Sequence, residues 1–255
     1  MSKVVSKTDA RGYRKQGTIL ERIKRSTKEK GLLHVIHTAA KVAFGLATNL
    51  ALCYLIYKPF RSKRTFVFQE KSYHYFYHWY NTAWKNERTI EIPIVSDIVN
   101  TYRGKKILEV GNVLSHYVPV NHDILDKYEE EAGVINQDIV EFNPPQKYDL
   151  IVSISTLEHV GWDERPRDKE NILKALKNLV FLLKYGGKLV VTFPLGYNPN
   201  LDSFLKNGEI KFTHLYCLKR SDKKNMWRES TYEEISDTQH GDPRHSLIVG
   251  IIEKQ

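Results

Sequence analysis

Acidic, hydroxyl and imidazole side chains follow a series of short apolar runs between residues 105 and 197. A histidine or carboxylate beside a bound hydroxyl can take its proton, and a carboxylate also accepts hydrogen bonds from sugar hydroxyls. The residues of interest at the ends of these runs are Glu109, Gly111, Asn112, Asp126, Asp138, Ile139, Ser155, Glu158 and His159. Their types indicate a site that binds a ligand bearing a sugar and moves a proton.

Carboxylates dominate this set, and the lysine pattern of a phosphate-binding loop is absent from the sequence. Such an acidic rim suits a cationic cofactor that carries a ribose better than it suits a polyphosphate. The two cysteines, Cys53 and Cys217, are too few for a disulfide framework or a four-thiolate zinc site. We therefore expect no metal site, and we expect a reducing, cytosolic setting.

The apolar runs alternate with helical patterns, as a parallel sheet requires. The runs that read as strands are 106–110, 122–125, 133–139, 148–154 and 188–193. A helical spacing of apolar residues fills 168–183, and two later runs, 215–219 and 247–253, are expected to pair antiparallel at the sheet edge. Alternating strands and helices predict an α/β fold with both sheet faces covered. Ligands of such sheets bind at the carboxyl ends of the strands.

Five of these segments together resemble the motifs of a known family. The segments are ILEVGNVLSHY, HDILDKY, GVINQDI, YDLIVSISTLEHVG and LKYGGKLVVTFPLG. In this order they resemble the consecutive motifs of the class I S-adenosylmethionine-dependent methyltransferases, over about residues 105–197, and the tail to residue 255 fits. The resemblance implies a Rossmann-like, mostly parallel seven-stranded sheet with helices on both faces. It also implies S-adenosyl-L-methionine as the cofactor.

The resemblance places Glu109, Gly111 and Asn112 on the loop where the backbone approaches the methionine part of the cofactor. Glycine suits this position because it lets a chain pass very close to a ligand. The family's loop is usually richer in glycine than this one, which has Val113 and Ser115 at two of the expected positions. The stretch from this loop to the next strand also leaves little room for a full helix.

The remaining positions of the resemblance concern the nucleoside and the reaction. Asp126 falls where the family's acid holds the ribose hydroxyls, Asp138 where an acid meets the adenine amino group, and Ile139 beside the ring. The alternative for the two aspartates is a pair of surface turn acids. Ser155 falls at the mouth of the pocket, where cofactor and acceptor meet.

His159 is the first candidate for the base that takes a proton from the acceptor, and Glu158 is the second. Their alternative roles are structural. Glu158 would then cap a turn or contact the backbone, and His159 would pack against the cofactor loop. The charged loop 163–168 that follows would select the acceptor or cap the next helix.

The net charge of +9 is confined to the N-terminal quarter of the chain. Residues 1–65 hold 15 Lys and Arg against 3 Asp and Glu, and the rest of the chain is slightly acidic. A folded domain that binds nucleic acid carries its positive charge itself, so we expect no nucleic-acid partner. The basic segment is expected to meet an anionic membrane surface through residues 1–64, and its first 25 or so residues to order only on meeting a partner.

The apolar stretch inside this basic segment allows three interpretations. Its uninterrupted core, 42–57, is roughly 24 Å long as a helix, short of the roughly 30 Å hydrocarbon core. Polar residues recur at helical spacing along it, namely His34, Thr38, Lys41, Gly45 and Asn49. In the first interpretation the helix lies in the membrane interface, and in the second it packs on the main domain or on a second subunit. In the third it crosses the membrane once.

Nine aromatic residues fall within 66–84. This segment is expected to form a helix packed on the main domain or a lid over the substrate pocket. The predicted divisions are a basic segment with an apolar helix at 1–65, an aromatic-rich helical cap at 66–97, and a methyltransferase-like domain at 98–255.

The predicted function is methyl transfer from S-adenosylmethionine to a hydroxyl of a small-molecule, glycan or lipid-linked acceptor. The glycan suggestion depends on the aromatic segment and on the polar stretch 218–229. The predicted location is the cytoplasm, with a peripheral membrane position as the alternative to a free one. The competing function is a catalytically inactive methyltransferase-like module recruited to a membrane. Nicotinamide chemistry is disfavoured because the three-glycine fingerprint is absent.

Overall fold

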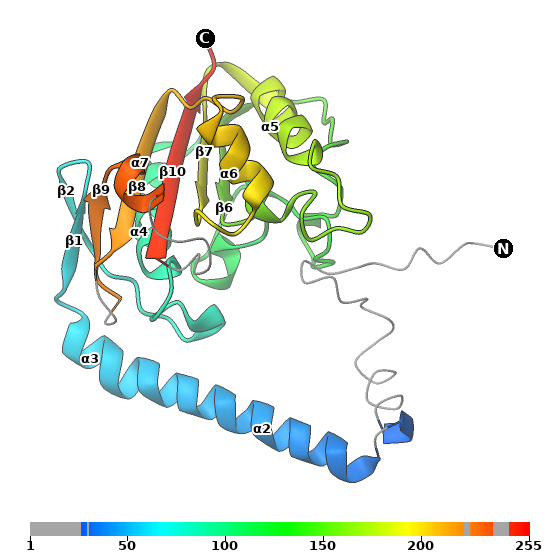
Figure 1. Cartoon of the computed structure of the whole chain (residues 1–255), viewed down its shortest axis with the longest axis vertical. Helices are drawn as coiled ribbons and strands as arrows, with labels where there is room; N and C mark the ends of the chain where they lie inside the picture. Colours follow the sequence, from blue (N-terminus) through cyan, green and yellow to red (C-terminus); the bar gives the residue numbers. More distant parts are fainter. Residues whose placement is uncertain (1–26, 30, 222–224, 237–244) are drawn as a thin grey trace.

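The structure is a computed structural model that describes residues 27–29, 31–221, 225–236 and 245–255. Figure 1 shows an α/β body and a long helix that runs beneath it. The first 25 or so residues, expected to order only on meeting a partner, and residues 222–224 of the polar stretch 218–229 lie outside the described residues.

A mixed sheet of eight strands forms the centre of the described body. The strands are β3 (Ile107–Val110), β4 (Asp123–Leu125), β5 (Val134–Ile135), β6 (Tyr148–Ile154), β7 (Leu183–Phe193), β8 (His214–Arg220), β9 (Trp227–Ser230) and β10 (Ser246–Glu253). Their order is β5-β4-β3-β6-β7-β10-β8-β9. The first five are parallel, and β10, β8 and β9 pair antiparallel.

The predicted Rossmann-like fold is confirmed, with one strand more than the seven expected. The predicted strands 215–219 and 247–253 pair antiparallel at this side of the sheet, as β8 and β10. The additional strand, β9, pairs with β8 at the edge. Its sequence, WRES, has no apolar run, because an edge strand with only Trp227 buried does not need one.

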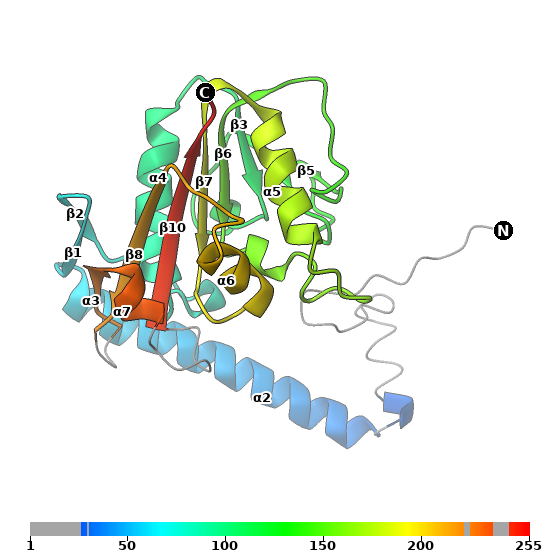
Figure 2. The same cartoon turned by 45° about the horizontal axis from the view of Figure 1, so that its top comes forward.

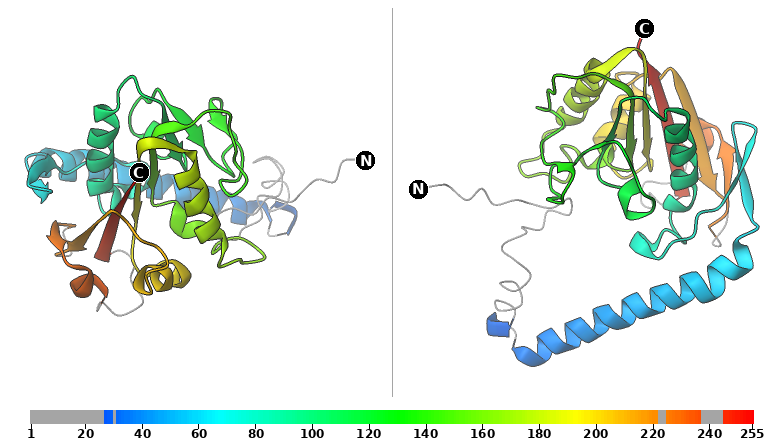
Figure 3. Two further views of the ribbon diagram at one scale, coloured as in Figure 1. Left: turned by 90° about the horizontal axis from the view of Figure 1, so that it is seen from above. Right: turned by 180° about the vertical axis from the view of Figure 1, so that it is seen from behind.

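Helices cover both faces of the sheet, as predicted. On one face, α5 (Asn171–Leu182), α6 (Pro199–Lys206) and α7 (Tyr232–Ser236) contribute to one apolar core. On the other face, α4 (Arg88–Thr101) and the aromatic segment contribute to a second core. Viewed from above, α4 and α5 lie on opposite sides of the strands (Figure 3). The described connection from β3 to β4 contains only a 3-10 turn, Leu114–His116, in agreement with the short spacing in the sequence.

The expected helical cap at 66–97 is wrong as a description of secondary structure. The chain forms a hairpin of β1 (Thr65–Phe68) and β2 (Lys71–His74), then a 3-10 turn at Tyr80–Thr82, and α4 begins only at Arg88. The hairpin forms because the burial of β1 alternates with period two and both turn residues adopt positive φ. Helix α4 also continues across the expected boundary at residue 97.

The aromatic residues of this segment pack on the body, which was one of the two expectations. Phe66, Phe68, Tyr75 and Trp84 are each at most 6% exposed within the second core. Trp84 also packs against Tyr57 of the N-terminal helix, with the two rings tilted and their centroids 4.3 Å apart, so these residues lie between the sheet and the end of that helix.

The N-terminal helix is continuous from Leu32 to Arg61 and is long and apolar enough to cross a membrane by length and composition. It comprises α2 (Leu32–Ala51), a π-helical turn (Leu52–Tyr57) and α3 (Lys58–Arg61). None of the 20 residues of α2, all of them described, is buried. The expectation that the apolar stretch packs on the main domain therefore holds only for its C-terminal end, where Cys53 is fully buried.

Candidate active site

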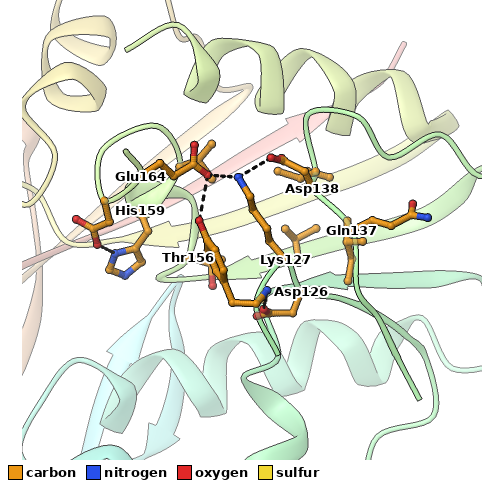
Figure 4. Close-up of a pocket in the computed structure, with 14 residues that line it drawn as sticks. Asp126, Lys127, Gln137, Asp138, Thr156, His159 and Glu164 are labelled. Carbon is orange, nitrogen blue, oxygen red and sulfur yellow. Dashed lines mark hydrogen bonds and ion pairs between the residues drawn. The ribbon is translucent and has the colours of Figure 1, made fainter. Parts of the chain in front are cut away.

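A cavity of about 190 Å³ lies at the carboxyl ends of β3, β4 and β6. The order of the parallel strands reverses here, since β3 is followed along the chain by β4 and β5 on one side and by β6 and β7 on the other. Ligands of doubly wound sheets bind at such a switch point. Figure 4 shows the side chains that line the cavity, which come from the strand ends and from the loop 156–164.

Five of the nine predicted site residues line this cavity, and four do not. The five are Gly111, Asp126, Asp138, Ile139 and His159. The four that lie outside its lining are Glu109, Asn112, Ser155 and Glu158. Among the described residues, no group of three or more His, Cys, Asp or Glu side chains is arranged to hold a metal ion.

Gly111 is required by two separate features of the loop after β3. Its φ is +86°, which side chains other than glycine rarely adopt, and a Cβ here would lie 2.2 Å from the Thr156 hydroxyl oxygen. The backbone of this loop therefore passes directly against the loop after β6. The expected approach of this loop to the methionine part of a cofactor stays a prediction.

Glu109 holds the loop that follows β3. One of its oxygens accepts hydrogen bonds from the amides of Val113 (2.9 Å) and Leu114 (2.7 Å), and the other lies 2.8 Å from His122 Nε2. Asn112 holds the same loop, because its side chain hydrogen-bonds Ser115. These bonds hold in place a turn that has few glycines.

Asp126 lines the cavity and also organises the turn that follows β4. Its Oδ1 accepts hydrogen bonds from the amides of Tyr128 (2.7 Å) and Glu129 (2.8 Å), and its Oδ2 accepts one of 3.3 Å from the Asn112 amide. The carboxylate is thus fixed at the cavity wall by three backbone donors. Asp126 joins two of the loops that form the site, and it also accepts from the amides of the turn that follows it.

Lys127 crosses the cavity between two carboxylates and was not predicted. Its Nζ lies 2.6 Å from Asp138 Oδ2 and 2.6 Å from Glu164 Oε1 (Figure 4). Burial lowers the pKa of Lys127, but the two carboxylates outweigh it and raise that pKa above its usual value. With Asp126 and Asp163, the lining holds four carboxylates and one lysine, a balance that favours a cationic ligand.

The bridge made by Lys127 also limits the cavity, since pockets for small ligands commonly measure roughly 300–1,000 Å³. We expect Lys127→Met to strengthen the binding of S-adenosylmethionine about two- to five-fold, because partly exposed ion pairs contribute only ~0–1 kcal/mol. Isothermal titration measures the change. A loss of affinity of ten-fold or more would instead mean that Lys127 itself contacts the ligand.

His159 forms a chain with two neighbours at one side of the cavity. Its Nδ1 lies 2.6 Å from Asp163 Oδ2, and the Tyr197 hydroxyl donates to the same oxygen at 2.8 Å. Burial lowers the pKa of His159, but the hydrogen bond to Asp163 and the charge of Glu158 raise that pKa above its usual value overall. An imidazole oriented by a carboxylate on one nitrogen is arranged to take a proton on the other.

Glu158 is buried behind His159 and is incompletely paired. It is 2% exposed, its Oε1 lies 3.8 Å from His159 Nε2, and within the described part of the chain its Oε2 has no hydrogen-bond partner. Burial raises the pKa of Glu158 to about 7, although the nearby His159 opposes this shift. A carboxyl group that titrates near neutral pH is suited to proton transfer.

The expectation that Ser155 lies at the pocket mouth is wrong, and Thr156 lines the cavity instead. Ser155 has a positive φ of 37°, and its hydroxyl donates to Glu91 Oε1 at 2.6 Å. The Thr192 hydroxyl donates to the same oxygen at 2.6 Å, and Arg88 donates to the other oxygen of Glu91 at 2.8 Å. The start of α4 thereby holds the end of β6 from the opposite side.

This buried network was also missed by sequence reasoning. The signal that could have revealed it is Glu91, a single carboxylate inside the apolar helical run RTIEIPIV. Glu91 is fully buried and Arg88 is 7% exposed. A buried carboxylate is retained in such a run only when charged or hydrogen-bonding partners satisfy it.

The strand order and the cavity at its switch point define a Rossmann-like α/β protein with a ligand site at the strand ends. No protein-family model and no curated protein matches the sequence. Solved structures of several methyltransferases resemble the fold. At TM-scores of 0.34 to 0.40, they add no argument about this site.

Three of these structures show the range of the similarity. The N-methyltransferase NodS from Bradyrhizobium japonicum, solved with S-adenosyl-L-homocysteine, is 12% identical, with 66% of this chain and 91% of NodS covered and a TM-score of 0.38. An rRNA methylase from Streptococcus thermophilus is 10% identical, with 65% and 97% covered and a TM-score of 0.40. The sugar N-methyltransferase KedS8 from Streptoalloteichus is 15% identical, with 65% and 87% covered and a TM-score of 0.34. Nothing in these comparisons supports the expected exclusion of nucleic acid.

Proposed function

We propose that the protein is an S-adenosylmethionine-dependent methyltransferase. The observation that carries the proposal is the cavity at the switch point, where Gly111, Asp126 and Asp138 meet His159. The lining is rich in carboxylates, so the residues present fit a cationic nucleoside. NodS, which was solved with S-adenosyl-L-homocysteine, is among the similar structures.

In this proposal each lining residue has a separate task. Asp126 accepts hydrogen bonds from the ribose hydroxyls, Asp138 accepts one from the adenine amino group, and Ile139 packs against the ring. The backbone at Gly111 passes the methionine part. When bound, the cofactor supplies an electrophilic methyl group, and the protein orients the acceptor toward it.

The acceptor in this proposal is a hydroxyl of a small molecule, a glycan or a lipid-linked group. A hydroxyl needs a base to take its proton as the new bond to carbon forms. His159 is in place for this because Asp163 holds its Nδ1 at 2.6 Å, and Glu158 lies next to its Nε2. The proposed location is cytoplasmic and peripheral to a membrane.

A second candidate function is a methyltransferase-like module without catalysis. The observation that favours it is the Lys127 bridge to Asp138 and Glu164, which crosses the proposed adenine site. The low glycine content of the loop after Gly111 points the same way. In that case S-adenosylmethionine would show no measurable binding to the full chain.

The test is isothermal titration of the full chain with S-adenosylmethionine. We expect binding, and we expect Asp126→Ala to weaken it roughly 100-fold, because hydrogen bonds to a charged group contribute about 1.5–3 kcal/mol each. Asp126→Asn is the matched control for the turn, since its amide oxygen still accepts from the Tyr128 and Glu129 amides, and it loses only the acceptor for the Asn112 amide. Thermal unfolding of both variants shows whether the turn is intact. Unchanged affinity in a folded Asp126→Ala protein would show that the ribose site is elsewhere.

A further inference from the structure

Helix α2, the part of the N-terminal helix that has no buried residues, has one side that faces the body and one that faces away from it. Asn49 fixes this rotation, because its side chain donates to the Trp79 carbonyl at 2.7 Å and its oxygen accepts from the Trp84 indole. At 3.6 residues per turn, Thr38 and Gly45 lie near the line of Asn49. These positions belong to the polar series recognised in the sequence.

The opposite side of α2 is apolar and strongly exposed. Leu33, Ala40 and Ala47 lie opposite Asn49, and Phe44 lies beside them. Leu33 is 83% exposed and Phe44 is 75% exposed. A continuous exposed apolar face of this kind marks a surface that meets a partner or a lipid.

The charge of this segment is complementary to an anionic lipid surface. Residues 31–64 hold five Lys and Arg and no Asp or Glu. Arg61 lies over the Tyr57 ring at 4.1 Å and Lys58 over the Tyr54 ring at 5.2 Å, near the point where the helix meets the body. Aromatic rings together with basic side chains are typical of the interface between lipid and water.

The body lies alongside α2, on one side of it. Figures 1 and 2 agree that α2 runs beneath the body over most of its length. If α2 crossed a bilayer in this arrangement, the charged surface of the body would enter the hydrocarbon layer, which is strongly unfavourable. If α2 lies in the plane of the membrane, the body stays in water.

The carboxyl ends of the parallel strands point toward α2. Strand β10 is antiparallel to β7 and ends at Glu253, near the C-terminus at the top of Figure 1. The carboxyl ends of β3, β6 and β7 therefore lie at the lower end of the body, where α2 runs. The cavity that contains His159 opens at this same edge of the sheet.

We propose that α2 lies in the plane of an anionic bilayer, with the face of Leu33, Ala40, Phe44 and Ala47 in the lipid. The edge of the sheet that carries the cavity then faces the membrane surface. This orientation does not depend on the proposed methyltransferase function, because it follows from the helix contacts and the direction of the strands.

The test is flotation of the full chain with two kinds of vesicle. One kind is phosphatidylcholine alone, and the other contains about 30% phosphatidylserine, enough to make the attraction of basic side chains measurable. We expect the protein to float with the anionic vesicles. Salt should weaken this binding, and alkaline carbonate should release the protein from the vesicles. Resistance to carbonate would identify a spanning helix and overturn the proposal. Equal flotation with both kinds of vesicle would also overturn it.

Two matched variants test which face of α2 meets the lipid. Phe44→Glu places a charge on the outward face, and Val42→Glu places the same charge near the line of Asn49, where Val42 is 56% exposed. We expect Phe44→Glu to weaken flotation at least ten-fold and Val42→Glu to change it less than two-fold. Equal losses would indicate a spanning helix. A lipid-free dimer that Phe44→Glu dissociates, in sedimentation analysis, would indicate a second copy on this face instead.

A fluorescent label at each end of the body tests the direction of the cavity. Gln137 is exposed in the loop after β5 and lines the cavity, and Tyr185 is 85% exposed at the opposite edge. Labels on Gln137→Cys and Tyr185→Cys avoid the native Cys53 and Cys217, which are buried. Energy transfer to a lipid-borne acceptor dye should be stronger from position 137. Stronger transfer from position 185 would overturn the orientation, whatever the protein's activity.

Discussion

Replacement of His159 by asparagine is expected to lower the rate of methyl transfer by roughly 10²–10⁴, the usual contribution of a positioned base. The affinity for S-adenosylmethionine should change by no more than about three-fold, because in the proposed arrangement the imidazole faces the acceptor. Asparagine keeps a donor for Asp163, so the hydrogen bond that holds the loop can form again. Single-turnover rates and titration calorimetry measure the two quantities separately.

The pH dependence distinguishes a base from a residue that only packs. The pKa of His159 lies above its usual value of 6.5, so the rate should rise as the pH passes through that pKa and the imidazole loses its proton. Asp163→Asn removes a cause of the raised pKa. The rising limb should then move to lower pH, and the plateau should fall because the ring is less well oriented. Unchanged profiles in Asp163→Asn and His159→Asn would exclude His159 as the base.

The location of the site could be predicted from the sequence, because parallel strands place their carboxyl ends at one edge of the sheet. Asp126 follows β4 directly, Asp138 is the third residue after β5, and both reach the cavity. Ser155 could not be placed in the same way, because side chains alternate sides near the end of a strand. A shift of one residue put Thr156 on the cavity and Ser155 on Glu91.

Lys127 and the Arg88–Glu91 pair depended on tertiary packing that the sequence does not encode locally. A lysine next to Asp126 reads as an exposed turn residue, but its long side chain reaches two carboxylates on other segments. Glu91 lies more than sixty positions before Ser155 in the chain and meets it only when α4 packs on the sheet. Such contacts between distant segments leave little trace in residue spacing.

The aromatic segment shows how one local pattern can predict the wrong element. The density of large rings correctly predicted packing on the body. It did not distinguish a helix from a hairpin, because aromatic residues favour strands as well. The alternation of Phe66 and Phe68 with exposed neighbours, and the turn residues Gln69 and Glu70 with positive φ, determine the hairpin.

Two buried glutamates near Arg88 are expected to affect stability in opposite directions. Glu91 has both oxygens paired, whereas the Oε2 of Glu158 has no partner in the described part of the chain. Glu91→Gln should lower the free energy of unfolding by about 3–5 kcal/mol, because it leaves the buried Arg88 guanidinium without its ion pair. Glu158→Gln removes a charge that burial already disfavours.

The size of the Glu158 effect should depend on pH. Its pKa in the folded protein is about 7, above the 4.5 of an ordinary glutamate, so below pH 4.5 the carboxyl is protonated in both states and costs nothing. Between pH 4.5 and about 7 the unfolded chain loses this proton while the folded protein keeps it, so stability falls over this range by up to ~3 kcal/mol and then levels off. Glu158→Gln should therefore match the parent protein near pH 4.5 and be more stable at pH 8.

Urea unfolding of both variants at pH 4.5, 6 and 8 measures these differences directly. A Glu158→Gln protein that is less stable than its parent at pH 8 would show that the carboxylate is satisfied in the folded state. If the variant instead gains stability while the rate of methyl transfer falls, Glu158 is held in an unfavourable environment because the reaction needs it there. A gain in stability together with a loss of rate distinguishes a functional carboxylate from a structural one. Glu91, which pairs with Arg88, is the structural carboxylate for comparison.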